Sequence, residues 1–348
     1  MSQSFSARVL RWYRKHGRHD LPWQQPRTLY RVWLAEIMLQ QTQVKTVIPY
    51  YQNFTRVFPS LKKLASASQD DVLAHWAGLG YYSRARNLHR AAQLIREVHK
   101  GRFPRDYESL LALPGIGPST AAAILSQALD QRQVILDGNV KRVLARYHAI
   151  AGWPGSPAVE QQLWQFAEQH TPGRNNADYT QAIMDLGATL CRRSKPDCPG
   201  CPLSADCQAL AQGRVSDYPA ARPRKILPVK AARMLLLANT EGAILLEKRP
   251  PSGIWGGLWS LPELAMDEDI AGACEQRWGV QVQSSDDGLT LRHSFSHYHF
   301  DITPCEVRFK TRTLRVGDDA ALHWYRPEQT KSLGLAAPVK RILDQYAR

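Results

Sequence analysis

The chain has 348 residues, of which 44% are hydrophobic and 22% charged, and this length is enough for two or three domains. The N-terminus lacks the apolar core of a signal peptide, and no apolar run is long enough to cross a bilayer. The sequence therefore predicts a protein of the reducing cytosol with no membrane partner, where structural disulfides are disfavoured.

The net charge of +14 is concentrated in one part of the chain. Residues 1–225 contain 30 Lys or Arg and 16 Asp or Glu, whereas residues 226–348 contain 15 of each. A basic domain of this kind is typical of a polyanion binder, with nucleic acid as the leading candidate. A basic surface that serves only solubility is the alternative.

The chain shows a helical pattern as far as about Leu210. It begins with an amphipathic segment that carries Phe5, Val9, Trp12 and Tyr13 on one side. Apolar residues then recur every three or four positions near residues 28–40, 43–58, 69–77, 83–100, 118–129, 139–150, 157–170 and 178–190. Short connections that contain glycine or proline separate these segments. We therefore predict an all-α region here.

The pattern changes after Cys207. The following stretch has three prolines, several basic residues and no periodicity, so we interpret residues 213–228 as a linker. Residues 232–250 predict two strands around a turn, residues 293–309 predict further strand, and Ala337–Tyr346 predicts a closing helix. The C-terminal part is therefore predicted to be an α+β domain.

Two glycines lie close together in the segment LPGIGPST, residues 113–120, which joins two helical patterns. At a helix entry, Gly115 and Gly117 would let backbone N–H groups approach an anion such as a DNA phosphate. An ordinary tight connection is the alternative. The exposed carbonyl groups of such a hairpin could also hold a monovalent cation.

Glu36 is the first candidate for a catalytic carboxylate. It shares a helix face with Leu29, Val32 and Trp33, so its side chain would point inward from an apolar wall. A desolvated carboxyl has a raised pKa and can act as an acid near neutral pH. A buried glutamate that pairs with an arginine is the alternative.

Asp137 is the second candidate. It follows an apolar run and precedes a helix, so by itself it fits a helix N-cap better than a catalyst. Asn139 could cap the same helix. Capping and catalysis do not exclude each other, and we carry both residues forward as site candidates.

Four of the six cysteines follow the spacing C-x6-C-x2-C-x5-C between Cys191 and Cys207. Four thiolates at this spacing suit either zinc or an iron–sulfur cluster, and the spacing alone does not decide between them. Arg192, Arg193 and Lys195 lie between the first two cysteines and predict a basic loop.

These motifs together resemble the MutY-type adenine DNA glycosylases, a family of the helix-hairpin-helix superfamily that includes endonuclease III. The resemblance covers nearly the whole chain. Its carriers are LPW (21–23), AEIMLQQTQV (35–44), GLGYYSRARNLH (78–89), LPGIGPSTAAAI (113–124), ILDGNVKRV (135–143), QAIMDLGA (181–188), the four cysteines and FSH (295–297).

The resemblance implies a multidomain fold. A six-helix domain with the helix-hairpin-helix would occupy residues 23–130. An iron–sulfur cluster domain would combine residues 1–22 and 131–212. The linker at 213–228 would then lead to a Nudix-like domain at 229–348. Cys191, Cys198, Cys201 and Cys207 would ligate a [4Fe–4S] cluster with a structural role.

The implied activity is base-excision repair, with double-stranded DNA as partner and adenine opposite 8-oxoguanine or guanine as target. Glu36 would protonate the adenine, Asp137 would stabilise the positive sugar, and Asn139 would help to hold Asp137 or the water. The implied contacts are Trp23, Gln41, Tyr81 and Gln181 at the base and its vacated space, Arg192, Arg193 and Lys195 at phosphates, and Phe295, Ser296 and His297 at 8-oxoguanine. Core packing is the alternative for Trp23.

Ser119 stands where lyase-competent relatives carry a Schiff-base lysine, so we predict a monofunctional glycosylase that does not nick DNA efficiently. The run at residues 272–279 keeps one of the acids that a Nudix metal site needs, so nucleotide hydrolysis is not expected. Cys274 and Cys305 are predicted to be buried thiols.

Three rival functions remain at this point. They are an endonuclease III-like glycosylase and lyase for another base, a non-catalytic metal-stapled DNA-binding protein, and an active Nudix phosphohydrolase. For the favoured reading we expect a monomer associated with the bacterial nucleoid in the cytoplasm, with repair or replication proteins as further partners.

Overall fold

The structure is a computed structural model that describes residues 4–223, 226–251, 253–295, 297–311, 321–326 and 333–346. The chain folds into two compact units. The first comprises Met1–Ser66 and Asn87–Arg224, and the second comprises Ala67–Arg86 and Lys225–Arg348. The domain boundaries given above stay a prediction.

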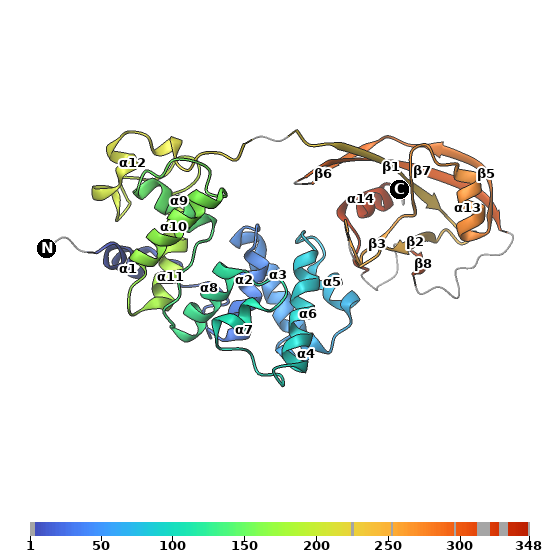
Figure 1. Ribbon diagram of the computed structural model, residues 1–348. Coiled ribbons are helices and arrows are strands. Elements are labelled where there is room, and N and C mark those ends of the chain that lie inside the picture. The colour runs from blue at the N-terminus through green and yellow to red at the C-terminus, as the bar shows by residue number, and fades with distance from the viewer. Residues whose placement is uncertain are drawn as a thin grey trace. The chain divides into compact units, whose positions relative to one another are not determined.

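The first unit is built from helices, as the apolar periodicity predicts (Figure 1). They are α1 (Phe5–His16), α2 (Leu29–Leu39), α3 (Val44–Val57), α4 (Leu61–Ala65), most of α6 (Ser83–Glu97), α7 (Tyr107–Leu111), α8 (Pro118–Leu129), α9 (Gly138–Tyr147), α10 (Pro157–His170), α11 (Asn176–Asp185) and α12 (Gln208–Ala211). Short 3₁₀ turns follow at η2 (Ser204–Asp206) and η3 (Val215–Asp217).

The helix predicted over residues 178–190 is divided in the structure. The α-helix α11 ends at Asp185, and a π-helix, η1 (Leu186–Leu190), continues the chain to Cys191. Apolar periodicity cannot distinguish a π turn from an α turn over so few residues. Single π turns are frequent at functional sites.

Small side chains explain the central position of α8 in the first unit. Ala121, Ala122 and Ala123 are all buried, and α8 packs against α2, α7 and α11. Alanine leaves the helix backbone accessible to its neighbours, so these helices approach closely. A second part of the core joins α1 to α9, α10 and α11 and contains Phe5 and Leu163.

The second unit holds the strands, which confirms the predicted α+β class. A five-stranded sheet has the order β4 (Glu263–Leu264), β1 (Val229–Leu237), β7 (His299–Thr311) and β5 (Val280–Asp287), with β6 (Leu291–Ser294) also paired to β7. A three-stranded sheet has the order β3 (Trp259–Ser260), β2 (Ile244–Lys248) and β8 (Leu322–Tyr325). The helices are α13 (Ile270–Trp278), α14 (Ala337–Tyr346) and α5 (Gln69–Trp76).

The strands predicted in residues 232–250 are present as β1 and β2, but they belong to different sheets. Only an isolated bridge between Ala238 and Ile244 links their ends. The central pair β1 and β7 is parallel. The segment predicted as strand at residues 293–309 instead forms a hairpin of β6 and β7.

Residues 67–86 join the second unit through polar contacts. Nζ of Lys248 lies 2.7 Å from Oδ2 of Asp70, and Nη1 of Arg86 donates to the carbonyl oxygen of Gly256 at 2.6 Å. Among the residues that the structure describes, no helix is both long and apolar enough to cross a membrane.

Candidate active site

A cavity of about 980 Å³ lies within the first unit, where α2, α3, α8, α9 and α11 meet. It collects most of the residues predicted for the base pocket, for catalysis and for the basic loop, namely Trp23, Glu36, Gln41, Ser119, Asp137, Asn139, Gln181, Arg192 and Arg193. Arg18, Lys45 and Arg142 also line it and were not predicted. The two candidate carboxylates thus line one space large enough for a nucleoside.

Glu36 projects into this cavity from α2. Thr28 caps the start of the helix by accepting a hydrogen bond from the backbone N–H of Arg31, and Val32 and Trp33 are buried on the inner face. Nε2 of Gln127 donates to Oε1 of Glu36 at 2.8 Å. Burial raises the pKa of Glu36 to about 7, against the lowering effect of this hydrogen bond, and nearby Asp137 raises it further.

The arginine pairing considered for Glu36 is not what the structure shows. Within the described parts of the chain, the carboxyl group forms no ion pair, and its recorded polar partner is the neutral amide of Gln127. A carboxyl without a counter-charge is easier to protonate, as an acid catalyst requires.

Asp137 is the N-cap of α9, as predicted, and it also faces the cavity. Its Oδ1 accepts from the backbone N–H groups of Asn139 at 2.9 Å and Val140 at 2.8 Å, and its Oδ2 accepts from Nδ2 of Asn139 at 3.0 Å. Burial raises the pKa of Asp137 while these hydrogen bonds lower it. The cap therefore holds the carboxylate in a fixed orientation.

Asn139 connects Asp137 to the cysteine loop through Arg142. Nη2 of Arg142 donates to Oδ1 of Asn139 at 2.8 Å and to the carbonyl oxygen of Gly187 at 2.6 Å. Nε of the same guanidinium donates to the carbonyl oxygen of Cys191 at 2.7 Å. Sequence reasoning missed Arg142, although its place one turn after Asn139 on the same helix is a usable signal.

Gln181 is held by a buried carboxylate. Its Nε2 donates to Oδ1 of Asp185 at 2.7 Å, and Asp185 is fully buried. Arg18 completes the network: its Nη2 lies 2.6 Å from Oδ1, and its backbone N–H donates to Oδ2 at 2.8 Å. Because a carboxylate only accepts hydrogen bonds, the amide nitrogen of Gln181 faces Asp185 and the amide oxygen faces away from it.

Trp23 lies both in the core and at the cavity, which were the two alternatives for this residue. The side chain is buried and meets Tyr51 edge-on at a ring distance of 5.4 Å, yet it also lines the cavity. Gln41 lies in the left-handed backbone region, with φ of 58°. Tyr81 belongs to the second unit, where it is 52% exposed and has φ of 49°.

The hairpin between α7 and α8 places its two glycines at the entry of α8, where the sequence predicts them. Gly115 has φ of 79°, and a Cβ there would lie 2.9 Å from Cβ of Asn87. Gly117 is the N-cap of α8 and Pro118 opens the helix. Oγ of Ser119 accepts from the backbone N–H of Leu136 at 3.1 Å, so this side chain ties α8 to the segment before Asp137.

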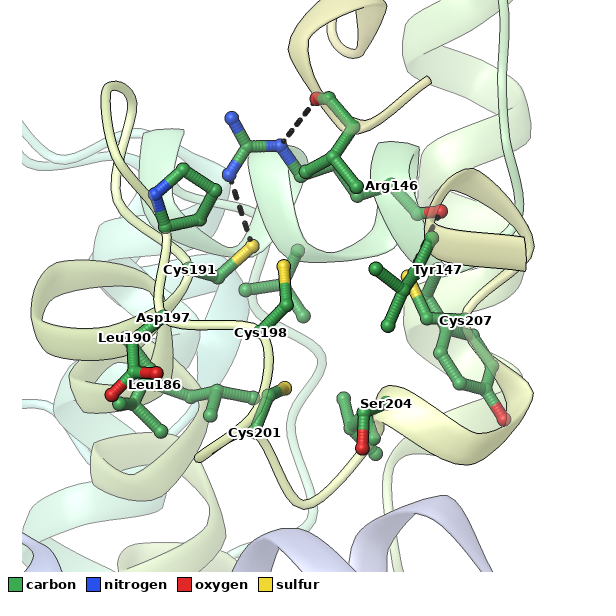
Figure 2. Close-up of a pocket in the computed structure, with 15 residues that line it drawn as sticks. Arg146, Tyr147, Leu186, Leu190, Cys191, Asp197, Cys198, Cys201, Ser204 and Cys207 are labelled. Carbon is green, nitrogen blue, oxygen red and sulfur yellow. Dashed lines mark hydrogen bonds between the residues drawn. The ribbon is translucent and has the colours of Figure 1, made fainter. Parts of the chain in front are cut away.

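The four clustered cysteines line one cavity of about 30 Å³, and Figure 2 shows their sulfur atoms turned toward a common space. All four are unpaired thiols, as expected in the absence of disulfides. Burial raises the pKa of the Cys198, Cys201 and Cys207 thiols.

Arg146 is a buried guanidinium beside this cavity that sequence reasoning missed. Its Nη1 lies 3.3 Å from Sγ of Cys191 and donates to the carbonyl oxygen of Arg192 at 2.7 Å (Figure 2). Its Nε donates to the carbonyl oxygens of Val215 at 3.1 Å and Tyr218 at 2.8 Å. One side chain thus joins the cysteine loop to the start of the predicted linker.

Lys195 lies in the same loop, outside the large cavity. It has φ of 49°, and its carbonyl oxygen accepts from Nη2 of Arg192 at 2.9 Å. Arg192, Arg193 and Lys195 are all exposed. They form a basic surface, as predicted.

The predicted recognition tip lies between β6 and β7 in the second unit. The backbone N–H of Phe295 donates to the carbonyl oxygen of Tyr298 at 2.9 Å, which closes the turn. Phe295 is half-buried and His297 is exposed. Ser296 lies outside the described residues.

The run at residues 272–279, where no Nudix metal site is expected, forms most of α13 and the residue after it, and the lack of nucleotide hydrolysis stays a prediction. Arg277 occupies the run expected to hold acids, and its Nη2 pairs with Oε2 of Glu247 at 2.9 Å. Cys274 and Cys305 are buried free thiols, as expected.

Two family models match the chain, one in its helical part and one in its C-terminal α+β part. The HhH-GPD superfamily of base excision DNA repair proteins matches residues 34–169, and the NUDIX domain matches residues 233–345. An adenine DNA glycosylase of Buchnera aphidicola (subspecies Acyrthosiphon pisum) is 38% identical over 344 residues, covering 99% of this chain and 98% of the relative. The chain belongs to the adenine DNA glycosylase family.

The chain is also similar to more distant proteins. The human adenine DNA glycosylase is 33% identical, covering 99% of this chain and 74% of its own length. A thermostable thymine-DNA glycosylase is similar in structure, with a TM-score of 0.55 and 27% identity over 60% of this chain and 95% of that one. A non-covalent endonuclease III–DNA complex shares the fold, with a TM-score of 0.51 and 19% identity over 60% of this chain and 94% of that one.

These matches confirm the resemblance and the multidomain fold class. An N-glycosylase of base excision repair is thereby favoured over a non-catalytic DNA-binding protein.

Proposed function

We propose that this protein removes adenine paired with 8-oxoguanine or guanine from double-stranded DNA and leaves the strand intact. The observation that carries the proposal is one cavity lined by two carboxylates, one of which has its pKa raised to about 7. An N-glycosidic bond to a purine requires an acid at the base and an anion at the sugar.

The chemistry follows from the two environments. The adenine leaves the base stack and enters the cavity, where Glu36 gives its proton to N7. The bond between C1′ and N9 breaks, its electron pair stays on the base, and the Asp137 carboxylate stabilises the positive sugar. Water adds to C1′ and returns a proton to Glu36. Asn139 holds Asp137 in place through the 3.0 Å hydrogen bond to Oδ2.

The test is single-turnover release of adenine from a duplex with adenine opposite 8-oxoguanine. Glu36→Gln keeps the side-chain shape and the acceptor for Gln127, so it should bind the duplex with affinity close to the parent but release adenine at least a hundredfold more slowly. Parent-like release by Glu36→Gln would remove Glu36 from the acid role.

Ser119 supports the absence of strand cleavage, because a hydroxyl cannot form an imine with the sugar aldehyde. Product strands should therefore break only after alkali treatment. Ser119→Lys should form a borohydride-trapped adduct with the abasic product, whereas Ser119→Ala should not. An adduct with the parent protein would contradict the monofunctional assignment.

We also propose that Cys191, Cys198, Cys201 and Cys207 ligate a [4Fe–4S] cluster. The four thiols line one cavity, but within the described residues no three His, Cys, Asp or Glu side chains could hold a single metal ion. The resemblance of this cysteine spacing to the cluster loop of the family favours a [4Fe–4S] cluster over zinc. When bound, the cluster would cross-link the loop that presents Arg192 and Arg193.

Purified protein should contain iron and acid-labile sulfide in equal amounts. Cys198→Ser should lose both, while Cys274→Ser, a buried thiol outside the loop, should retain both. Stoichiometric zinc without sulfide would contradict the cluster assignment.

We propose that duplex phosphates are bound by Arg192, Arg193, Lys195 and the backbone N–H groups at Gly115 and Gly117. We also propose that the space that the adenine vacates is occupied by Gln41 and Tyr81. Affinity should fall steeply as salt concentration rises. Arg193→Gln should reduce that salt dependence equally for matched and mismatched duplexes. We expect the protein to act as a monomer on nucleoid DNA.

Finally, we propose that Phe295, Ser296 and His297 read the 8-oxoguanine opposite the target. The half-buried ring of Phe295 and the exposed His297 support this assignment. Phe295→Ala and His297→Ala should each lower the preference for adenine opposite 8-oxoguanine over adenine opposite guanine.

A further inference from the structure

Trp255 has an unusual backbone conformation for a large side chain. Its φ is 52°, in the left-handed region, and its indole is only 9% exposed. A non-glycine residue is unfavourable in this region, so surrounding contacts must compensate for it. Such strained residues concentrate where a side chain has to be held in one place.

The loop around Trp255 is held by backbone contacts on both sides. Its carbonyl oxygen accepts from the backbone N–H of Leu258 at 2.9 Å, and Nε of Arg249 donates to the carbonyl oxygen of Ile254 at 3.0 Å. Gly256 has no room for a side chain, because a Cβ would lie 2.6 Å from the carbonyl oxygen of Pro251. The loop is therefore closely packed against its own ends.

The buried indole supports three aromatic rings of the β6–β7 hairpin. Ring distances from Trp255 are 5.7 Å to His293, 5.5 Å to Phe295 and 5.9 Å to Phe300. His293 also meets Phe295 edge-on at 4.6 Å, and burial lowers its pKa, so it packs there as a neutral ring. Offset and edge-on aromatic pairs at these distances are favourable beyond simple burial.

Phe295 lies just after the last residue of β6, where ladder hydrogen bonds end. The turn is closed by the bond from Phe295 to Tyr298, and Oγ of Ser294 lies 2.8 Å from Nδ1 of His299. These bonds fix the backbone of the turn but not the direction of the Phe295 ring. Four rings lie around it, with centroid distances of 4.6 Å to His293, 4.9 Å to Tyr298, 5.5 Å to Trp255 and 6.1 Å to His297. Among these four, Trp255 is the one that a loop outside the hairpin supplies.

We infer that Trp255 is the positioning residue for Phe295 and hence for discrimination of the base opposite the adenine. This inference rests on the proposed role of the residue 295–297 tip. Without the indole, the Phe295 ring keeps the ring contacts of its own hairpin and samples more orientations, so contacts specific to 8-oxoguanine weaken. Adenine excision itself occurs in the other unit and does not use Trp255.

The test compares Trp255→Asn with Trp255→Phe. Asparagine tolerates the left-handed conformation, so the loop backbone is preserved while the ring is lost. Phenylalanine keeps a ring at the same place. Single-turnover adenine release is measured on duplexes with 8-oxoguanine or guanine opposite the adenine, and the ratio of the two rates is the readout.

Trp255→Asn should lower this ratio at least fivefold while the rate on the guanine duplex changes less than twofold. Trp255→Phe, whose ring is smaller, should keep a reduced preference, between about half and four-fifths of the parent ratio. The control is Trp278→Phe, which alters a more deeply buried indole of the same unit that donates from Nε1 to Glu247 at 3.0 Å. The control should lower the melting temperature without changing the ratio.

Two outcomes separate this inference from the proposed function. If Phe295→Ala and His297→Ala leave the ratio unchanged, the tip does not read the opposite base and both ideas fall. If those variants lower the ratio but a folded Trp255→Asn does not, only the positioning role of Trp255 is wrong. Should Trp255→Asn fail to fold, the Trp255→Phe ratio decides, since parent-like discrimination at less than full indole contact contradicts the inference.

Discussion

Gln127 and Glu36 are joined by a hydrogen bond of 2.8 Å from amide Nε2 to carboxyl Oε1, across 91 positions of sequence. A neutral amide satisfies one oxygen of the buried carboxyl without supplying a positive charge. Burial therefore dominates, and the pKa of Glu36 rises to about 7. The result is a carboxylic acid that is about half protonated at neutral pH.

Adenine release should depend on pH through both carboxyl groups. The reaction needs Glu36 protonated and Asp137 ionised, so the rate should fall as pH rises through about 7. Gln127→Leu removes a hydrogen bond that lowers the pKa of Glu36, so the alkaline limb should move to higher pH. Single-turnover rates across the pH range test this, and a limb that stays in place contradicts it.

The stability of the protein should also depend on Glu36. Its folded pKa of about 7 lies above the ordinary value of 4.5, so the folded state binds this proton more tightly than the unfolded chain. The contribution is favourable at acid pH and is lost as pH rises from about 4.5 to about 7. Glu36→Gln has no such proton to lose. Its free energy of unfolding relative to that of the parent should therefore rise by roughly 1–3 kcal/mol between acid and alkaline pH. Denaturant unfolding of both proteins at acid and at alkaline pH measures this change. An equal difference between variant and parent at the two pH values would contradict the prediction.

Asp185 should control which bases the cavity accepts. Its carboxylate turns the amide oxygen of Gln181 away from itself, so Gln181 offers an acceptor that suits an amino group such as N6 of adenine. Asp185→Asn can also donate, which lets the Gln181 amide turn over. We expect discrimination between adenine and hypoxanthine, which carries a carbonyl at that position, to fall at least tenfold.

The control for this prediction is Arg18→Met, which breaks the same buried ion pair but leaves the carboxylate. Both variants should be less stable than the parent, since each disrupts the 2.6 Å contact. Only Asp185→Asn should change the ratio of excision rates. Equal loss of discrimination in both variants would show that packing, and not amide orientation, sets the preference.

Gly187 should be intolerant of a side chain. A Cβ there would lie 2.6 Å from Cβ of Asn139, whose amide holds Asp137. Gly187→Ala should therefore slow adenine release at least tenfold with little change in duplex affinity. Gly173→Ala is the control, because a Cβ there meets nothing within 4 Å, and it should behave as the parent.

The elements that sequence could predict are those set by local patterns. Apolar spacing indicated the inner face of α2 and so the direction of Glu36. The apolar run before Asp137 indicated its place as N-cap of α9. The cysteine spacing indicated one shared site, and the four thiols do line one cavity. The family resemblance supplied the roles, which the geometry alone does not.

The partners of these residues were not predictable in the same way. Gln127 lies 91 residues from Glu36, and Arg18 lies 167 residues from Asp185. Periodicity shows that a residue faces inward but not which polar atom it meets there. The π turn after Asp185 and the membership of residues 67–86 in the second unit depend on tertiary packing for the same reason.

Arg146 also bears on the length of chain that separates the two units. Its hydrogen bonds to the carbonyl groups of Val215 and Tyr218 fasten the first residues of the predicted linker to the cysteine loop. The free part of the linker predicted at residues 213–228 thus starts after Tyr218. Loss of the Arg146 side chain would release this attachment and lengthen the free segment, even where each unit stays folded.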